Sequence, residues 1–142
     1  MSKVSTILAR KGSNAVSIQT STKVYDALKI MSDKNIGSLV VFKDESYAGI
    51  FTERDYSRKV ILEGKHSDEV TVGEIMSVDL PTVGPDDTVE RCMQLMSDKN
   101  VRYLPVFDGD SLSGIISISD VVTETILQQK ETINQLQNYI HG

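Results

Sequence analysis

The chain is poor in the residues that several common kinds of protein depend on. It has one cysteine, no tryptophan and three prolines in 142 residues. A single cysteine excludes an internal disulfide and fits a reducing compartment. No apolar run approaches the ~20 residues that a membrane-spanning helix needs, and the first residues lack the apolar stretch of a secretory signal. We therefore expect a cytoplasmic protein that does not act in the membrane.

Positive charge is also in short supply. The formal net charge is −5 and the sequence pI is about 5.0. An acidic chain argues against a broad surface for nucleic acid or for anionic lipid. A local basic pocket for one phosphorylated small molecule is compatible with this charge. The length fits one compact module with a sizeable core.

What the chain does contain is an internal repeat. The sequence Met-Ser-Asp-Lys-Asn occurs at 31–35 and again at 96–100, a shift of 96 − 31 = 65 residues. The same shift brings Val24 onto Val89 and Asp55 onto Asp120 without a gap. A unit of this length is too long for a solenoid repeat, and two copies are too few for an array. We expect two half-domains related by a pseudo-two-fold axis, with two related clefts that favour binding over catalysis.

The hydrophobic pattern predicts the same order of elements in both copies. A short helix leads into a short strand, a helix, two strands joined by a tight turn, and a final helix, which gives a β-α-β-β-α unit of the α/β (α+β) class. The expected divisions are a first unit at 1–64, a second at 65–128 and a helical extension at 129–142. The expected elements are helices at 3–8, 22–35, 52–64, 72–76 and 88–100 and from 117 onward, with strands at 15–19, 38–42, 48–51, 81–83, 103–107 and 112–116.

The last helix is longer than its counterpart in the first copy. One edge carries apolar residues at a spacing of three to four, interrupted by Gln129, namely Val122, Ile126, Ile133, Leu136 and Ile140. Such an edge needs a cover. It either folds back on its own domain or packs on a second subunit, and the frequency of two-fold dimers favours a homodimer.

A motif with side chains that could bind a ligand follows the return strand of each copy. Gly49-Ile-Phe-Thr-Glu-Arg-Asp55 and Gly114-Ile-Ile-Ser-Ile-Ser-Asp120 share the pattern Gly, two apolar residues, Thr or Ser, any two residues, then Asp. Helix capping alone explains a hydroxyl followed three residues later by an acid. The same atoms also suit a nucleotide, because a helix start attracts phosphate and an Asp carboxylate accepts hydrogen bonds from the two hydroxyls of ribose.

These duplicated motifs, in this frame and with the Lys11-Gly12 pair near the start, resemble the cystathionine-β-synthase (CBS) domain. A tandem pair resembles a Bateman module in a small stand-alone protein. The resemblance implies a regulatory module that is not an enzyme and that binds an adenosyl ligand, such as AMP, ADP or ATP, with NAD and S-adenosylmethionine as further candidates. It also implies flat dimers and the transmission of ligand occupancy to an effector protein, which the sequence does not name.

The resemblance also assigns two nucleotide-binding sites, each built from both copies. One takes its residues from the second motif and from the start of the first copy: Ser117, Ser119, Asp120, Lys11, Gly12, Val16, Ile36 and Gly37. The other combines the first motif with the second copy: Thr52, Arg54, Asp55, Leu80, Thr82, Val101, Arg102 and Tyr103. The copies differ where Gly37-Ser38 faces Arg102-Tyr103 in the alignment, so the two sites should not be equivalent.

Other residue types offer little chemistry. Cys92 takes a core position in its helix and is expected to be buried and inert. His66 and His141 give no metal-ligand spacing with one cysteine, so no metal and no catalytic cofactor are expected. The main alternative to a nucleotide sensor is a CBS-fold dimerisation or protein-interaction module without nucleotide. An enzyme is disfavoured because the sequence shows no nucleophile–base pair.

Overall fold

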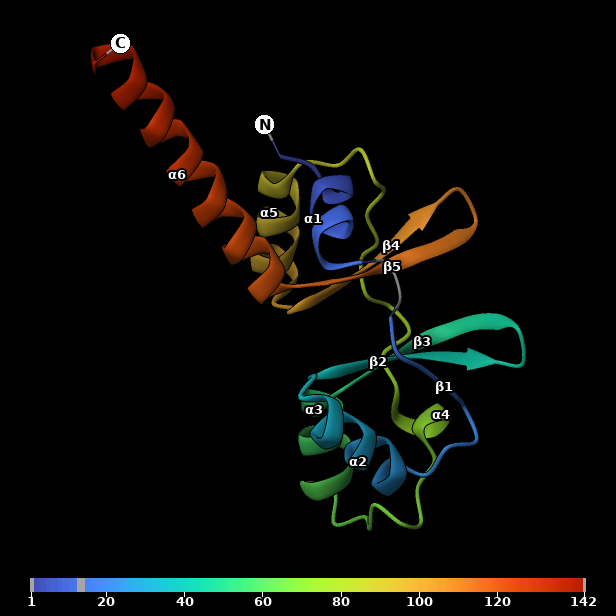
Figure 1. Ribbon diagram of the computed structural model, residues 1–142. Coiled ribbons are helices and arrows are strands. Elements are labelled where there is room, and N and C mark those ends of the chain that lie inside the picture. Colours follow the sequence, from blue (N-terminus) through green and yellow to red (C-terminus); the bar gives the residue numbers. More distant parts are fainter. Residues whose placement is uncertain (1, 13–14, 142) are drawn as a thin grey trace. The chain divides into compact units, whose positions relative to one another are not determined.

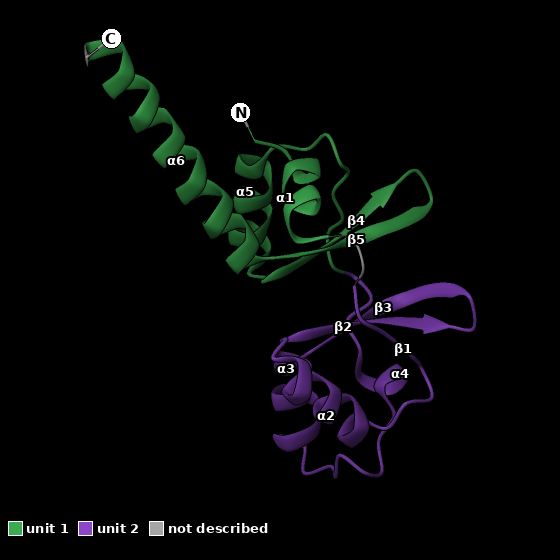
Figure 2. Cartoon of the chain, viewed as in Figure 1, with its two compact units in different colours: residues 1–14, 80–142 green, residues 15–79 purple. Residues whose placement is uncertain are grey.

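The computed structural model describes residues 2–12 and 15–141 (Figure 1). Two compact units are present (Figure 2): unit 1 contains Met1–Asn14 and Leu80–Gly142, and unit 2 contains Ala15–Asp79. The elements run α1 (Val4–Lys11), β1 (Ser17–Gln19), α2 (Val24–Lys34), β2 (Ser38–Lys43), β3 (Ser46–Thr52), α3 (Glu53–Tyr56), the π-helix η1 (Ser57–Ile61), α4 (Val72–Ile75), α5 (Val89–Lys99), β4 (Tyr103–Asp108), β5 (Ser111–Ser117) and α6 (Ile118–His141).

Unit 2 is built on a three-stranded sheet of order β1-β2-β3. β1 pairs with β2 in parallel, and β2 pairs with β3 in an antiparallel hairpin. The helix α2 presents Val24, Ala27 and Met31 at helical spacing, and these side chains join a buried cluster with β2 and β3 residues. The short helix α4 closes the same core through Val72 and Ile75.

Unit 1 repeats the hairpin with β4 and β5 and covers it with α1, α5 and α6 (Figure 2). Its core gathers buried apolar side chains from all five elements, among them Ile7, Cys92, Leu104, Ile116 and Val121. The two hairpins carry the same irregularity, because the register shifts between Val41 and Phe42 in one and between Val106 and Phe107 in the other. The repeat therefore extends to a backbone bulge.

The repeated asparagine ends the repeated helix. Asn35 follows α2 with φ 54° and Asn100 follows α5 with φ 52°, both in the left-handed region. Asparagine enters this region more readily than most other residues, and its backbone N–H then satisfies the last carbonyls of the helix. The predicted α/β class and the long final helix are confirmed.

The short helices that precede each repeat, α1 and α4, do not follow the expected division of the chain at residue 64. Val4 and Ile7 of α1 lie in the core of unit 1, and the Val4 N–H donates to the carbonyl of Asp87 at 2.9 Å. Conversely, α4 lies in unit 2, where the Val72 N–H donates to the carbonyl of Thr22 at 2.8 Å. The compact units therefore differ from the expected ranges 1–64 and 65–128, because each lead-in helix buries its apolar face with the other copy.

Two local predictions differ from the structure. The strand expected at 81–83 is a single parallel bridge between Val83 and Val106, consistent with a Pro81 that lacks the N–H needed for pairing. At the start of α5 the Thr88 side chain accepts the capping hydrogen bond, while Asp87 accepts one from the Gly84 N–H at 2.7 Å. The helix expected at 52–64 is a short α-helix that continues as a π-helix.

The helix α6 continues well past its contacts with α1, α5 and β5 (Figure 1). Every residue from 129 to 140 is exposed. None of the helices in the described part of the chain is both long and apolar enough to cross a membrane.

Candidate functional site

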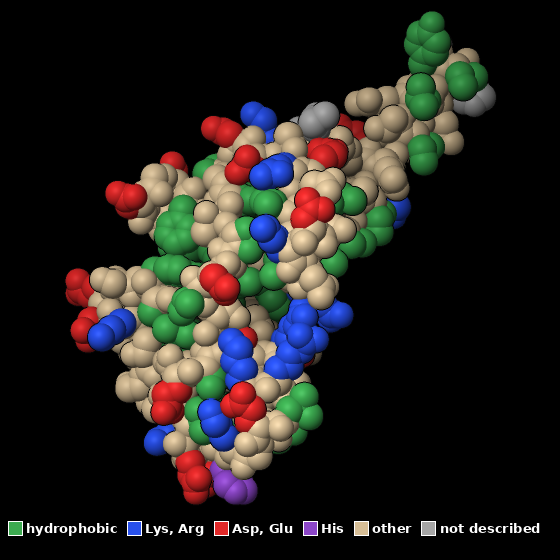
Figure 3. All heavy atoms as spheres, turned by 180° about the vertical axis from the view of Figure 1, so that it is seen from behind, with side chains coloured by type: hydrophobic (Ala, Val, Ile, Leu, Met, Phe, Trp, Pro, Cys, Tyr) green, Lys and Arg blue, Asp and Glu red, His purple; other side chains and the backbone are tan. Residues whose placement is uncertain are grey.

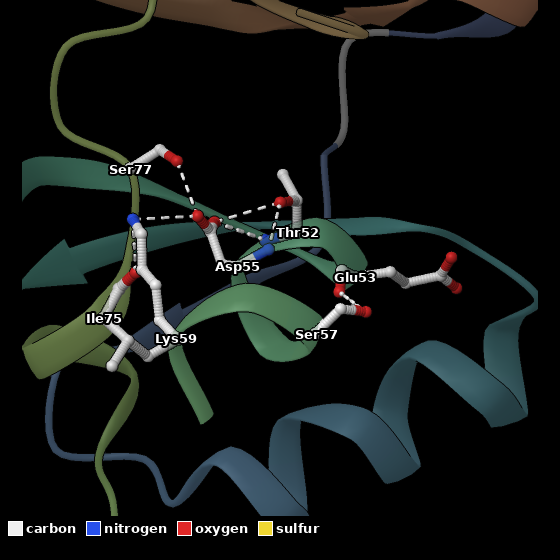
Figure 4. Close-up of polar contacts among 7 residues, drawn as sticks. All are labelled: Thr52, Glu53, Asp55, Ser57, Lys59, Ile75 and Ser77. Atoms are coloured by element: carbon white, nitrogen blue, oxygen red, sulfur yellow. Dashed lines mark hydrogen bonds and ion pairs between the residues drawn. The ribbon is translucent and has the colours of Figure 1, made fainter. Parts of the chain in front are cut away.

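The first motif forms a closed capping arrangement at the start of α3 (Figure 4). The Thr52 hydroxyl accepts a hydrogen bond from the Asp55 N–H at 3.1 Å. In return, Oδ2 of Asp55 accepts from the Thr52 N–H and from the Thr52 hydroxyl, both at 3.0 Å. This is the reciprocal pattern of a capping box, so the capping interpretation of the motif holds at this helix.

The second oxygen of Asp55 is also engaged (Figure 4). Oδ1 accepts from the Ser77 hydroxyl at 2.8 Å and lies 3.0 Å from the Lys59 ammonium, which also donates to the carbonyl of Ile75. Asp55 is only 4% exposed. Both oxygens of this carboxylate therefore have partners inside unit 2, unlike the open acceptor that a ribose would need.

The other predicted residues of unit 2 lie close to the same helix start. The Glu53 N–H donates to the carbonyl of Gly37 at 3.2 Å, which places the start of β2 against the start of α3. Val16 and Ile36 are half-buried against the core of unit 2. Arg54 is half-buried in α3. The structure thus brings Gly37 to the motif of its own unit, whereas the resemblance assigned it to the site of the other motif.

The second motif is more open than the first. The Ser117 hydroxyl accepts from the Asp120 N–H at 3.2 Å, and Oδ2 of Asp120 accepts from the Ser117 N–H at 2.8 Å. The side chain of Asp120 is 20% exposed, against 5% for Asp55. Among the described residues, hydrogen bonds and ion pairs reach only Oδ2 of Asp120, so Oδ1 can still accept.

Lys11, from the end of α1, reaches this second motif. Its ammonium lies 2.7 Å from Oδ2 of Asp120 and donates to the carbonyl of Ile115 at 3.0 Å. The following Gly12 has φ +89°, a backbone conformation that favours glycine. The Lys-Gly pair and the second Asp motif, which the resemblance assigned to one site, are therefore brought together in unit 1.

The remaining predicted residues also lie in unit 1. The carbonyl of Arg102 accepts from the Ile118 N–H at 2.9 Å, which sets the start of β4 beside the start of α6. Ser119 and Thr82 are exposed, and Leu80, Val101 and Tyr103 are half-buried. The residues assigned to each site fall in both units, and the two-site assignment stays a prediction.

Two sets of polar contacts were not predicted from the sequence. Ser77 and Lys59 hold Oδ1 of Asp55. Lys59 could have been found, because it lies four residues after the acid on one helical face, but Ser77 is 22 residues away. The second missed group is the ion pair from Arg10 to Glu124, which ties α1 to α6 at a Glu124 that is 3% exposed.

Other candidate chemistry is sparse. Cys92 is buried as predicted, and burial raises the pKa of its thiol to about 11. Among residues 2–12 and 15–141, no three His, Cys, Asp or Glu side chains are grouped to hold a metal ion. A surface hollow of about 350 Å³ in unit 2 contains none of the predicted site residues and is lined by Tyr25, His66, Ser67 and Asp68.

Comparison with known proteins gives one consistent result. The family model for the CBS domain matches residues 4–61 and again 72–126. The mitochondrial CBS domain-containing protein CBSX3 of Arabidopsis thaliana is 40% identical over 148 aligned positions, covering 98% of this chain and 72% of the relative.

Solved structures agree with this relative. A protein with CBS domains from Burkholderia ambifaria has 41% identity and a TM-score of 0.86, with 90% of this chain and 96% of that one covered. A hexameric CBS-CP12 protein from bloom-forming cyanobacteria has 34% identity and a TM-score of 0.74, with 85% and 66% covered. The repeat, the motif-bearing helix starts and these matches together show that the chain belongs to the CBS-domain family, of which it carries two copies.

Proposed function

We propose that the chain is a regulatory sensor module that binds an adenine nucleotide and transmits its occupancy to an effector protein. AMP, ADP and ATP are the first candidates, with NAD as a further one. The observation that carries the proposal is the second motif, where one oxygen of Asp120 accepts from none of the described residues and lies beside a lysine and a serine at a helix start. The related Burkholderia protein is described as a candidate signal-transduction protein, which agrees with a sensing role.

The chemistry at the start of α6 fits a phosphorylated nucleoside better than a neutral one. The ribose diol would donate to Asp120, as an acceptor-only carboxylate favours. One hydroxyl can donate to Oδ1, whereas the second would compete with Lys11 for Oδ2 and release the Lys11 ammonium to meet a phosphate. The Ser117 hydroxyl would add a donor for the anion, and the positive end of the α6 helix dipole would add attraction. No catalytic cofactor is needed for this role, and we propose no enzymatic reaction.

The two motifs should respond differently. Asp55 is buried and all its acceptors are in use, so a ligand at that motif must first displace Ser77 or Lys59. Asp120 needs to give up only the partly exposed Lys11. We propose that the nucleotide binds first, and more tightly, at the site that contains Asp120.

A homodimer is the proposed assembly. The cyanobacterial CBS-CP12 protein is hexameric, which supports oligomerisation of related chains. We place the protein in the cytoplasm, while a mitochondrial location, as named for the Arabidopsis relative, is the competing location.

The competing function is an interaction or dimerisation module without nucleotide. The capping box at Asp55 favours it, because the motif there serves the fold alone.

A thermal-shift panel of AMP, ADP, ATP, NAD and S-adenosylmethionine separates the two functions. A ligand at ~100 times its dissociation constant adds about 2.7 kcal/mol to the free energy of unfolding, which raises Tm by several degrees in a domain of this size. A response to one or more adenine nucleotides, lost in Asp120→Ala, is expected. No response from protein shown to be free of carried-over ligand would leave the interaction module as the function.

A further inference from the structure

We propose that the exposed part of α6 forms a parallel two-stranded coiled coil with the same helix of a second copy of this chain. The inference deepens the proposed homodimer by naming its interface, and it does not depend on nucleotide binding. The seam follows alternating steps of four and three residues and consists of Val122, Ile126, Gln129, Ile133, Leu136 and Ile140.

No described part of the chain covers the seam. Its apolar side chains are 51%, 46%, 53%, 57% and 73% exposed at Val122, Ile126, Ile133, Leu136 and Ile140. Figure 3 shows hydrophobic side chains on the surface of the projecting end of this helix. The face of α6 that packs into unit 1 is a different one, marked by Val121 and Glu124, which are 1% and 3% exposed. A second helix could therefore dock without disturbing unit 1.

The spacing selects the kind of partner. Steps of four and three average 3.5 residues, the repeat that keeps one stripe of a helix facing another helix along a left-handed supercoil. Isoleucine takes one seam position at 126, 133 and 140, and the other is taken by Val122, Gln129 and Leu136. β-branched residues at the first position, with leucine at one of the second positions, favour two parallel strands.

Gln129 fits this arrangement as a register residue. In a parallel pair, equivalent positions face each other, so the two Gln129 amides can donate to and accept from one another. A single polar residue in an apolar seam fixes register and strand number at some cost in stability. The interruption of the apolar edge thus becomes part of the specificity of the interface.

Charge favours a second copy over a membrane or a charged partner. Lys130 and Glu131 are the only charged residues between Thr125 and Ile140, so this stretch has no net charge. Two identical stretches do not repel, and one lysine is too little to hold an anionic lipid surface.

The body of unit 1 extends the same strip. From Val122 to Ile140 the seam spans about 27 Å at 1.5 Å per residue, which is short for an isolated coiled coil. Met93 of α5 is 46% exposed, and its sulfur lies 3.8 Å from the Thr125 hydroxyl oxygen, so apolar surface continues beside the first turn of the seam. Attachment to a folded unit also removes the cost of nucleating the helix.

Sedimentation without nucleotide tests the interface with neighbouring substitutions of equal charge. Ile133→Glu places a carboxylate in the seam, while Asn134→Glu places it one residue away, outside the seam. We expect wild type and Asn134→Glu to sediment as dimers at micromolar concentration. Ile133→Glu should dissociate at least roughly tenfold more readily, because burial of a carboxylate against an apolar strip is costly. A monomeric wild type, or equal dimerisation of the two variants, would overturn the proposal.

Disulfide trapping tests the orientation. Cys92 is buried and is the only native cysteine, so Ile140→Cys adds the only exposed thiol. A parallel pair brings the two introduced thiols together and gives a cross-linked dimer under mild oxidation, whereas an antiparallel pair holds them at opposite ends. A dimer without the cross-link would refute the parallel arrangement. Nucleotide affinity, measured separately on Ile133→Glu, should equal that of wild type, so failure of the coiled coil and failure of nucleotide sensing give different results.

Discussion

Replacement of Asp55 by alanine should destabilise the protein far more than replacement of Asp120, although the two acids occupy equivalent positions in the repeat. Asp55→Ala removes the acceptor for four donors at once: the Thr52 N–H and hydroxyl at 3.0 Å, the Ser77 hydroxyl at 2.8 Å and the Lys59 ammonium at 3.0 Å. Thr52 is 8% exposed, so its donors are poorly placed to find water instead.

The magnitude follows from these contacts. Loss of the capping interaction costs about 1 kcal/mol. That figure includes the Thr52 N–H; the buried Thr52 hydroxyl left without an acceptor adds about 1–3 kcal/mol, and the half-buried Ser77 hydroxyl can be rehydrated. The side chain of Lys59 is 43% exposed and can be rehydrated, so its ion pair contributes little. We expect a total near 3 kcal/mol for Asp55→Ala and about 1 kcal/mol, the cost of a helix cap, for Asp120→Ala.

Urea unfolding followed by far-ultraviolet circular dichroism, without nucleotide, measures this difference. The midpoint should fall further for Asp55→Ala than for Asp120→Ala, with m unchanged. Thermal unfolding should show a Tm lower by roughly 6–12 °C for Asp55→Ala, at 2–4 °C per kcal/mol. Equal losses for the two variants would refute the structural role assigned to Asp55.

Three further predictions concern the packing of the units. Gly49→Ala would set a Cβ 2.5 Å from a backbone carbonyl oxygen and should lower the free energy of unfolding in urea by about 2 kcal/mol or more. In the control variant Gly84→Ala the Cβ meets nothing closer than 3.6 Å, so the free energy of unfolding should change little. Arg10→Ala leaves the buried carboxylate of Glu124 without its cation and should cost about 3 kcal/mol in urea unfolding; a negligible cost would argue against the ion pair. Cys92 has a pKa of about 11 and should resist iodoacetamide at pH 8 until the protein unfolds; rapid labelling of the native protein would contradict this prediction. The unfolded thiol loses its proton at a lower pH than the native thiol, so the free energy of unfolding should fall between pH 9 and 11.

Much of the fold could be predicted because the sequence contains an internal repeat. The repeated Met-Ser-Asp-Lys-Asn sequence predicts equivalent helices, and the structure ends both at the asparagine. The exchange of lead-in helices between the copies could not be read from periodicity. An amphipathic pattern shows that α1 and α4 need a cover, but only tertiary packing decides which copy supplies it.

The candidate site could likewise be predicted only where it depends on local sequence. The motif predicts where Asp55 and Asp120 stand, since both follow a return strand at a helix start. It does not predict that Ser77 closes one of them, because that contact depends on the bridge between Ile50 and Ser77 in unit 2. Local sequence determines the capping hydrogen bonds, whereas contacts between distant segments decide which carboxylate keeps an oxygen to which no described residue donates.

Isothermal titration of the ligand-free protein with AMP and with ATP, repeated on Asp120→Asn, tests nucleotide sensing most directly. The variant keeps the size of the side chain and one acceptor oxygen while it loses the charge. We predict saturable binding to wild type, and binding weaker by about 1.5–3 kcal/mol to Asp120→Asn, the range for a hydrogen bond to a charged group. Replacing the nucleotide by its deoxyadenosine analogue should lower the affinity of wild type and lower the affinity of the variant by a smaller factor. Binding of equal strength to both proteins, or no heat of binding with either nucleotide, would contradict the account.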